Sequence, residues 1–558
     1  MGGPRAGADT QSLATSTSSA GSAERSSLPG RRWLAVLAAY LLAGVALFTV
    51  YLRLSETYPL NSDSANILLM GWDLLHGHLL LHGWYMSDVS FYPTELPQYA
   101  LLESFLGLHM QTAHVAAAMT YTLTFLFAVL LARSGSTGRE AMIRTLIAAG
   151  IMLAPQFGLG VFALDLSVGH IGTSVPLLVT WLLLDRMQAR WYVPVLTALL
   201  LTWALVADPI VYIVGVGPLG AVAAVRVIRG MVSDGGSWTG RIARQWYDFS
   251  LGTAAVVATA LAWVVNNLLS ALGGYTVNRL PFYLVSWHNL HNNAPAGWKV
   301  LGIFGANYAG LSGVWLLLAF LHLASVLLVL WALVRVAWRF FSVSLVDQVL
   351  AVAIVLNVGL FLLTNASEEA AHEVAIILPF GAALAARVLV RAVSGAAAND
   401  QAAASNGLSR RVRLASFVAG IGVLLGYTAG LGYEISQPTA PPANASLAPW
   451  LLDHDLTYGL SGYWTSSSVT VNSGGRVEIR ALLQYTMKRD LWMSNVSWYD
   501  PKLHYANFIV LDSRPGFMNH WEPRALIRKY FGRPARIYHT GPYTVLVWNR
   551  NLLNSIPR

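Results

Sequence analysis

The sequence predicts an all-α polytopic membrane domain of about eleven transmembrane helices, followed by a small C-terminal domain of α/β or β-rich fold. Only 11% of the 558 residues are charged, although soluble globular chains carry about 25%. Apolar stretches of about 20 residues, long enough to cross a bilayer as helices, recur from Trp33 to Tyr433. Residues 434–558, in contrast, have an ordinary polar composition.

The N-terminal segment 1–30 is rich in Ser, Gly and Ala, so we expect a disordered cytoplasmic tail. The apolar run that follows is too long for a signal-peptide core and has no small-residue cleavage site before Arg53, so we interpret it as the first membrane helix. The membrane domain then extends over 31–433. Its predicted spans are 33–52, 111–132, 145–163, 171–184, 191–207, 210–228, 249–272, 311–334, 346–364, 373–390 and 414–433.

The basic residues predict the orientation of these helices. With the N-terminus inside, every Lys and Arg of residues 1–433 falls in an inner segment, except Arg53, Arg279 and Lys299. This distribution follows the positive-inside rule. An odd number of spans then places the C-terminal domain outside a cell membrane that the chain crosses many times. Because the charges lie in short turns between apolar runs, the net charge of +9 does not indicate a nucleic-acid partner.

The predicted outer surface is more elaborate than the inner one. Its long loops cover 53–110 and 273–310, and loops of that length often carry function. A Pro-rich linker over 434–446 leads to the soluble domain, 447–558. In that domain the stretches SSVTVNSGG, VEIRALLQY, ANFIVLDS and YTVLVWN predict strands, and EPRALIRKYFG predicts a short helix that ends at Gly532.

The first outer loop contains the acids Asp63, Asp88 and Glu95. Carboxylates beside a membrane-adjacent cavity can act as general bases, or as ligands for a divalent cation such as Mg²⁺ or Mn²⁺. The alternatives are structural: Asp63, in Asn-Ser-Asp-Ser, can cap a helix, Asp88 can cap a turn, and Glu95 can be a solvated acid. Apolar residues at helical spacing predict that the loop forms amphipathic helices along the bilayer surface. Three histidines in this loop have no recognised metal-ligand spacing: His76, His78 and His82.

A second group of ionisable residues lies in short outer turns. Asp165 and His170 occur in LDLSVGHIGT, at a predicted membrane surface where such groups are functional or paired with each other. Asp208 occurs in VADPIVY, where Pro209 by itself accounts for a tight turn, so we favour a structural role there.

A third group precedes the predicted span 373–390. Glu368, Glu369, His372 and Glu373 form a net acidic cluster that suits a cation or an amine better than bare phosphate; the alternative is that they only cap the helix at the interface. Arg279 is one of the few outer cations. It is the candidate partner for a lipid-linked phosphate, or otherwise an anchor at the headgroups.

These features together resemble the GT-C superfamily of membrane glycosyltransferases, which includes protein mannosyltransferases, aminoarabinose lipid A transferases and oligosaccharyltransferases. The resemblance covers about residues 31–558, with its motif in 61–99. It implies transfer of a sugar from a polyprenyl-phosphate carrier to a glycan, lipid or protein acceptor outside a bacterial cell. Asp63 matches the first-loop catalytic acid, although many members have a second acid where Ser64 stands. In the same comparison, Asp165 corresponds to a second acid, and the charged residues before the late helix lie near the carrier phosphate.

Two other classes of function remain open. A transporter or lipid flippase would carry acids buried within its spans and two related halves, whereas the ionisable groups here lie mainly in loops. The other class is a non-catalytic scaffold for envelope assembly. No P-loop, GxGxxG or HExxH motif stands in a convincing context, which argues against chemistry on soluble nucleotides.

Overall fold

The computed structural model describes residues 29–153, 169–233, 235, 237–306, 312–365, 371–400, 407–516 and 519–557. Its contacts divide the chain into two units, Met1–Ala46 and Leu47–Arg558. The described part of the first unit is the beginning of helix α1 (Pro29–Ser55). The second unit contains the remaining helices, both long outer loops and the C-terminal region.

The predicted spans coincide with helices, in whole or in part. The helices of the membrane region after α1 are α4 (Met110–Arg133), α5 (Gly138–Met152), α7 (Ser174–Arg186), α8 (Tyr192–Ala207), η1 (Tyr212–Val216), α9 (Gly217–Ser233), α10 (Trp238–Arg244), α11 (Trp246–Ala271), α13 (Gly313–Leu321), α14 (Leu323–Trp338), η3 (Phe340–Ser342), α15 (Leu345–Leu363), η5 (Ala371–Val374), α16 (Ile377–Asp400) and α17 (Gly407–Ser436). Within the described ranges, 7 helices are long and apolar enough to cross a membrane. The predicted span 145–163 extends beyond the described residues.

A buried ion-pair network joins three of these helices. Arg387 of α16, whose side chain is fully buried, donates to Asp185 of α7 at 2.6 Å and to Asp347 of α15 at 2.5 Å. Arg391 donates to the second oxygen of Asp347. A buried charge is tolerated when it is paired and hydrogen-bonded in this way. The network therefore fixes α7, α15 and α16 against one another.

The first outer loop folds into α2 (Ser62–Leu75), β1 (Trp84–Met86) and α3 (Glu95–Leu106). Helices form here as expected, and the apolar side chains in the first half of α2 pack against protein. Ile67 and Leu68 are fully buried in the protein, in a cluster that also contains Tyr99 of α3 and Val471 of the C-terminal region. The apolar face of α2 is therefore covered by protein rather than by lipid.

The second long outer loop contains β2 (Thr276–Val277), η2 (Trp287–Asn293) and α12 (Ala296–Ile303). Strand β1 pairs in parallel with β2 and antiparallel with β5 (Ser494–Asn495), which gives a small three-stranded sheet. This sheet connects both outer loops to the C-terminal region.

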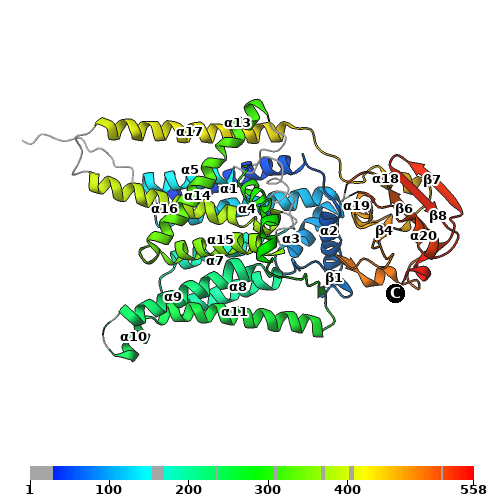
Figure 1. Cartoon of the computed structure of the whole chain (residues 1–558), viewed down its shortest axis with the longest axis horizontal. Helices are drawn as coiled ribbons and strands as arrows, with labels where there is room; N and C mark the ends of the chain where they lie inside the picture. The colour runs from blue at the N-terminus through cyan, green and yellow to red at the C-terminus, as the bar shows by residue number, and fades with distance from the viewer. Residues whose placement is uncertain are drawn as a thin grey trace, which may run out of the picture. The chain divides into compact units, whose positions relative to one another are not determined.

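The C-terminal region is a mixed α/β structure, one of the two alternatives predicted. Figure 1 shows its strands and short helices, α19 among them, gathered beyond α2. The main sheet has the order β4-β3-β6-β8-β7, with parallel pairing of β3 to β4 and β6 and antiparallel pairing of β8 to β6 and β7. Its elements are α18 (Leu447–Asp453), β3 (Tyr458–Ser461), α19 (Tyr463–Asn472), β4 (Glu478–Ala481), η6 (Val496–Tyr499), β6 (Phe508–Asp512), α20 (Arg524–Phe531), β7 (Arg536–Thr540), β8 (Tyr543–Val547) and η7 (Leu552–Ser555).

One predicted strand is wrong. The stretch SSVTVNSGG lies mostly in helix α19, while the strands predicted in VEIRALLQY, ANFIVLDS and YTVLVWN are present as β4, β6 and β8. Alternation of Ser or Thr with Val is typical of a half-buried strand, but residues 465–471 are all buried. Their hydroxyls bond to backbone carbonyls of the preceding turn, as from Ser466 to Tyr463 at 2.9 Å. Such bonds satisfy polar side chains inside a helix that is covered on every side.

Candidate active site

Asp63 lies in the first turn of α2 but does not cap it. The N-cap is Asn61, whose side-chain oxygen accepts from the backbone N–H groups of Asp63 at 3.0 Å and Ser64 at 3.5 Å. The capping interpretation of Asp63 is therefore wrong. Its carboxylate is free for another interaction, and it receives one from the C-terminal region.

Tyr463, the first residue of α19, donates its hydroxyl to Asp63 Oδ1 at 2.6 Å. The same hydroxyl accepts from Asn66 Nδ2 at 3.1 Å, so two side chains of helix α2 orient it. Burial raises the pKa of Asp63 above its ordinary value, while the Tyr463 hydrogen bond and the field of His372 partly oppose the rise. Asp63 is thus a carboxylate with increased basicity, held by a donor that favours its ionised form.

Glu95 begins α3 and is only 5% exposed. The hydroxyl of Thr94 donates to it. Burial raises the pKa of Glu95 to about 7, so this side chain titrates in the neutral range. Gly172 packs against the carboxyl group so closely that a Cβ there would lie 1.8 Å from Glu95 Oε1. Any other residue at position 172 would therefore displace Glu95.

His170 lies between two carboxylates. Its Nδ1 is 2.7 Å from Asp208 Oδ2, and its Nε2 is 3.2 Å from Glu373 Oε2. Thr173 also donates to Asp208, at 2.5 Å, and Asp208 accepts from the backbone of Ile210 at 2.9 Å. Burial disfavours the charged imidazole, but the two carboxylates outweigh it and hold the pKa of His170 well above its ordinary value. His170 is therefore a buried imidazolium.

Asp88 and His372 complete this group. Burial raises the pKa of Asp88, the positive charge of His170 lowers it, and Glu373 and Asp208 raise it further. The Nε2 of His372 lies 3.5 Å from Glu373 Oε1, and its ring centroid lies 6.1 Å from that of His170. We call the following side chains the acid cluster: Asp63, Asp88, Glu95, His170, Asp208, His372 and Glu373.

The acid cluster contains the three predicted catalytic acids, Asp63, Asp88 and Glu95, and two of the predicted binding residues, His170 and His372. Three other predicted residues lie outside the described residues: Asp165, Glu368 and Glu369.

Arg279 is exposed, and no hydrogen bond or ion pair of its side chain is found in the described part of the chain. Its neighbour Asn278 donates its backbone N–H to Ser87 O at 3.1 Å and its side-chain amide to Met86 O at 2.6 Å. Arg279 therefore belongs to a segment that is fixed beside the segment of Asp88.

Sequence reasoning missed the roles of Tyr463 and Asp208. Tyr463 is 400 residues away from Asp63 in the chain, and no sequence pattern connects them. Asp208 was assigned to a turn, and it does accept from Ile210, but it also pairs with His170. The Asp165–His170 pairing that we considered is not needed to satisfy His170, because both of its ring nitrogens are bonded to other side chains.

Metal ligation finds no support in the described residues, where no group of three His, Cys, Asp or Glu side chains could hold an ion together. The loop histidines have other partners. His76 Nδ1 lies 2.7 Å from Trp72 O, His82 Nδ1 lies 2.5 Å from Gly273 O, and His78 faces Asp73 at 3.5 Å.

Comparison with known proteins supports the fold. No family model and no curated protein matches the sequence. The structure of ArnT from Cupriavidus metallidurans bound to undecaprenyl phosphate is similar at a TM-score of 0.51, covering 92% of this chain and 98% of that chain at 13% identity. The Archaeoglobus fulgidus oligosaccharyltransferase, in a complex with Zn and sulfate, is similar at a TM-score of 0.44, covering 84% of this chain and 68% of that chain at 15% identity.

The likeness to ArnT extends over most of both chains. The predicted GT-C-like fold is therefore confirmed: a helical membrane domain with several apolar spans and a C-terminal mixed α/β region.

Proposed function

We propose that this protein is a membrane glycosyltransferase that moves a sugar from a polyprenyl-phosphate carrier to a glycan, lipid or protein acceptor on the extracytoplasmic face. The fold supports this proposal, because ArnT, which it resembles, was solved bound to undecaprenyl phosphate. The observation that carries it is Asp63. This acid does not cap its helix, is half-buried as part of the acid cluster, and is bonded to a tyrosine of the C-terminal region.

In the proposed reaction, Asp63 accepts the proton of an acceptor hydroxyl. The hydroxyl oxygen then forms a bond with the anomeric carbon of the donor sugar, and the bond between that carbon and the phosphate oxygen breaks. The polyprenyl phosphate leaves with the electron pair of that bond. A positioned carboxylate contributes roughly 10²–10⁴-fold to such a step by general base catalysis. Asp88 and Glu95 are the next candidates for this role, since both lie in the acid cluster.

The phosphate of the donor requires a cation. We propose that Arg279 supplies it, because a guanidinium can bind two phosphate oxygens at once and the segment of Arg279 is fixed beside that of Asp88. A divalent cation such as Mg²⁺ or Mn²⁺ is the alternative phosphate partner, and the described carboxylates alone do not form a site for it. The acceptor, or a cationic group on it, would bind to the net acidic side chains around His170 and His372, together with Asp165, Glu368 and Glu369.

The test is turnover of a polyprenyl-phosphate sugar by the purified chain and by Asp63→Asn. We expect Asp63→Asn to lose roughly 10²–10⁴-fold in turnover. The matched control is Asp73→Asn in the same helix, because Asp73 accepts from Trp84 Nε1 at 2.7 Å and lies outside the acid cluster. An active Asp63→Asn variant would assign the chemistry to another residue. A folded wild type without any turnover would favour the flippase, transporter or scaffold instead.

A further inference from the structure

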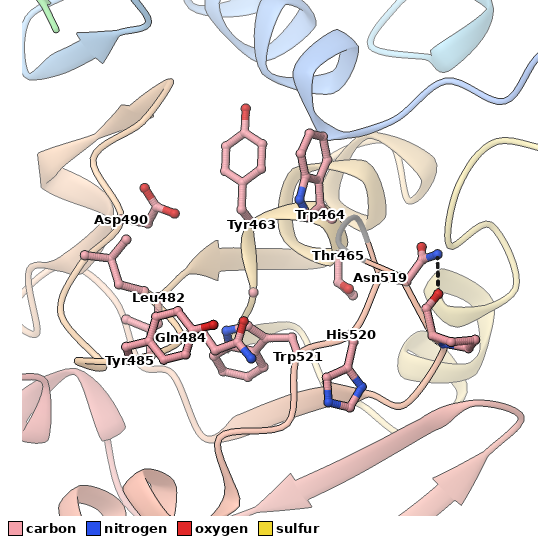
Figure 2. A pocket seen from close by; sticks show the side chains of 14 residues that line it. Tyr463, Trp464, Thr465, Leu482, Gln484, Tyr485, Asp490, Asn519, His520 and Trp521 are labelled. Atoms are coloured by element: carbon pink, nitrogen blue, oxygen red, sulfur yellow. Dashed lines mark hydrogen bonds between the residues drawn. The ribbon is translucent and has the colours of Figure 1, made fainter. Parts of the chain in front are cut away.

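The C-terminal region contains a cavity of about 460 Å³ directly beside Tyr463. Figure 2 shows Tyr463 and Trp464 on one side of it and Tyr485 and Trp521 on the opposite side. Polar groups lie between these rings, and they come from Gln484, Asp490, Asn519 and His520. The lining thus combines aromatic faces with hydrogen-bonding side chains.

Packing against neighbouring side chains does not explain why every aromatic residue of this cavity is there. Tyr485 lies in the chain reversal between Leu482 and Arg489, which form an isolated β-bridge, and it is 85% exposed. Trp521 is only 5% exposed, yet its Nε1–H has no acceptor among the described residues. A buried indole N–H normally has a hydrogen-bond partner. An exposed aromatic ring therefore lines the cavity together with a buried indole whose N–H has no partner among the described residues.

The charge of the lining excludes an anionic ligand. Among the described residues that line the cavity, none is Lys or Arg, and Asp490 is an acid. Its carboxylate is oriented by the backbone N–H of Trp492 at 3.1 Å. A phosphate or a sugar acid would be repelled by this carboxylate and would find no Lys or Arg among the described lining residues. A neutral sugar, in contrast, offers hydroxyls to the carboxylate and amides and an apolar ring face to the aromatic side chains.

One residue of the cavity wall, Tyr463, is hydrogen-bonded to a member of the acid cluster. Tyr463 contributes to the wall of the cavity, while its hydroxyl reaches Asp63 at 2.6 Å. The charge of Asp490 also acts on Tyr463, helping to raise the pKa of that phenol beyond the effects of burial and Asp63. A ligand in the cavity therefore lies next to the proposed general base.

We propose that this cavity is an acceptor subsite that binds a neutral sugar residue, so that the acceptor is a neutral glycan rather than an anionic polymer. This inference rests on the proposed glycosyltransferase function. In the proposed subsite, Tyr485 and Trp521 contact the acceptor sugar, and Tyr463 connects the bound acceptor to Asp63.

The experiment measures binding of neutral saccharides to the full chain in detergent, without donor, by calorimetry. The probes are the methyl glycosides and short oligosaccharides of glucose, galactose, mannose and arabinose, with a glucuronic acid disaccharide as the anionic comparison. We expect at least one neutral probe to bind, and Tyr485→Ala to weaken its affinity by about tenfold, which corresponds to about 1.4 kcal/mol. The control is Tyr505→Ala, because Tyr505 is also an exposed tyrosine of this region, at 55%, but does not line the cavity.

Two further measurements separate this inference from the proposed function. Slow hydrolysis of the donor by the wild type in the absence of acceptor tests the chemistry alone, and it should be unchanged in the control variant Tyr505→Ala. Trp521→Ala removes a second aromatic ring from the wall of the cavity, and it should also weaken binding of the neutral probe. Absence of binding by every neutral probe, equal affinities in wild type and Tyr485→Ala, or tighter binding of the glucuronic acid probe would overturn the acceptor subsite. Absence of donor hydrolysis by the wild type would instead overturn the proposed glycosyltransferase function.

Discussion

Replacing Tyr463 with Phe should change the pH dependence of turnover. The Tyr463 hydroxyl donates to Asp63 Oδ1 at 2.6 Å, so it stabilises the ionised carboxylate and lowers its pKa. Hydrogen bonds to charged groups contribute about 1.5–3 kcal/mol. One pKa unit corresponds to about 1.4 kcal/mol, so loss of this bond should raise the pKa of Asp63 by roughly 1–2 units.

The sign of the effect on activity follows from the proposed role. Asp63 must be ionised to accept a proton, so turnover falls as the pH decreases through its pKa. In Tyr463→Phe the pKa is higher, and the fall therefore begins at higher pH. The measurement is kcat/KM for a polyprenyl-phosphate sugar as a function of pH, in which the acidic limb should move upward by roughly 1–2 pH units.

The matched control is Tyr543→Phe. Tyr543 is also a buried tyrosine of the C-terminal region, and its hydroxyl donates to Asn444 Oδ1 at 2.8 Å, in a different hydrophobic cluster from that of α2. This variant should lose some stability and keep the acidic limb of the wild type. An unmoved acidic limb in an active Tyr463→Phe enzyme would show that Asp63 is not the group whose ionisation limits turnover.

Three other predictions address orientation, donor binding and stability. Because the chain has no cysteine, a single introduced cysteine can report topology, and both Ser237 and Lys502 are exposed. In intact cells, Ser237→Cys should be protected from an impermeant thiol reagent, and Lys502→Cys should react with it. The reverse pattern would contradict the outward-facing site. Arg279→Lys should weaken the affinity for a polyprenyl-phosphate sugar and Arg279→Ala should weaken it more, because Lys keeps the charge but not the two-pronged geometry; equal affinities would leave a metal ion as the phosphate partner. Arg387→Ala should lower the free energy of unfolding by about 3–5 kcal/mol, because Asp347 would remain buried without Arg387. Thermal unfolding in detergent measures this loss. A loss of less than about 1 kcal/mol, which is the contribution of a surface ion pair, would contradict this account.

The helices of the membrane region were predictable because lipid imposes a simple requirement. Each span must satisfy its backbone hydrogen bonds internally over a length set by the bilayer, and this requirement is visible in the length of an apolar run. The strands β6 and β8 were predictable for a similar reason, since they are short buried runs of β-branched and aliphatic residues. Helix α19 was not, because it is buried on all faces and its alternating Ser, Thr and Val residues carry no helical periodicity.

The site was only partly predictable because its members come from distant segments. Asp63, Asp88 and Glu95 lie in one loop, so their proximity could be expected from the sequence. The partners of His170 could not, since Asp208 is 38 residues away and Glu373 is 203 residues away. Those pairs depend on how the helices pack, which a single sequence does not encode in any local pattern.

The arrangement of charges in the acid cluster limits where each substrate group can bind. His170 is a cation shared by Asp208 and Glu373, so these two carboxylates are largely neutralised by it. Asp63 and Glu95 make no ion pair with a described residue, and burial raises the pKa of both. A phosphate placed against them would be repelled and would raise both pKa values further, which would remove the base. In the proposed reaction, the donor phosphate would therefore bind away from Asp63 and Glu95, towards a cation such as Arg279, and the acceptor hydroxyl would approach Asp63 from the side of Tyr463.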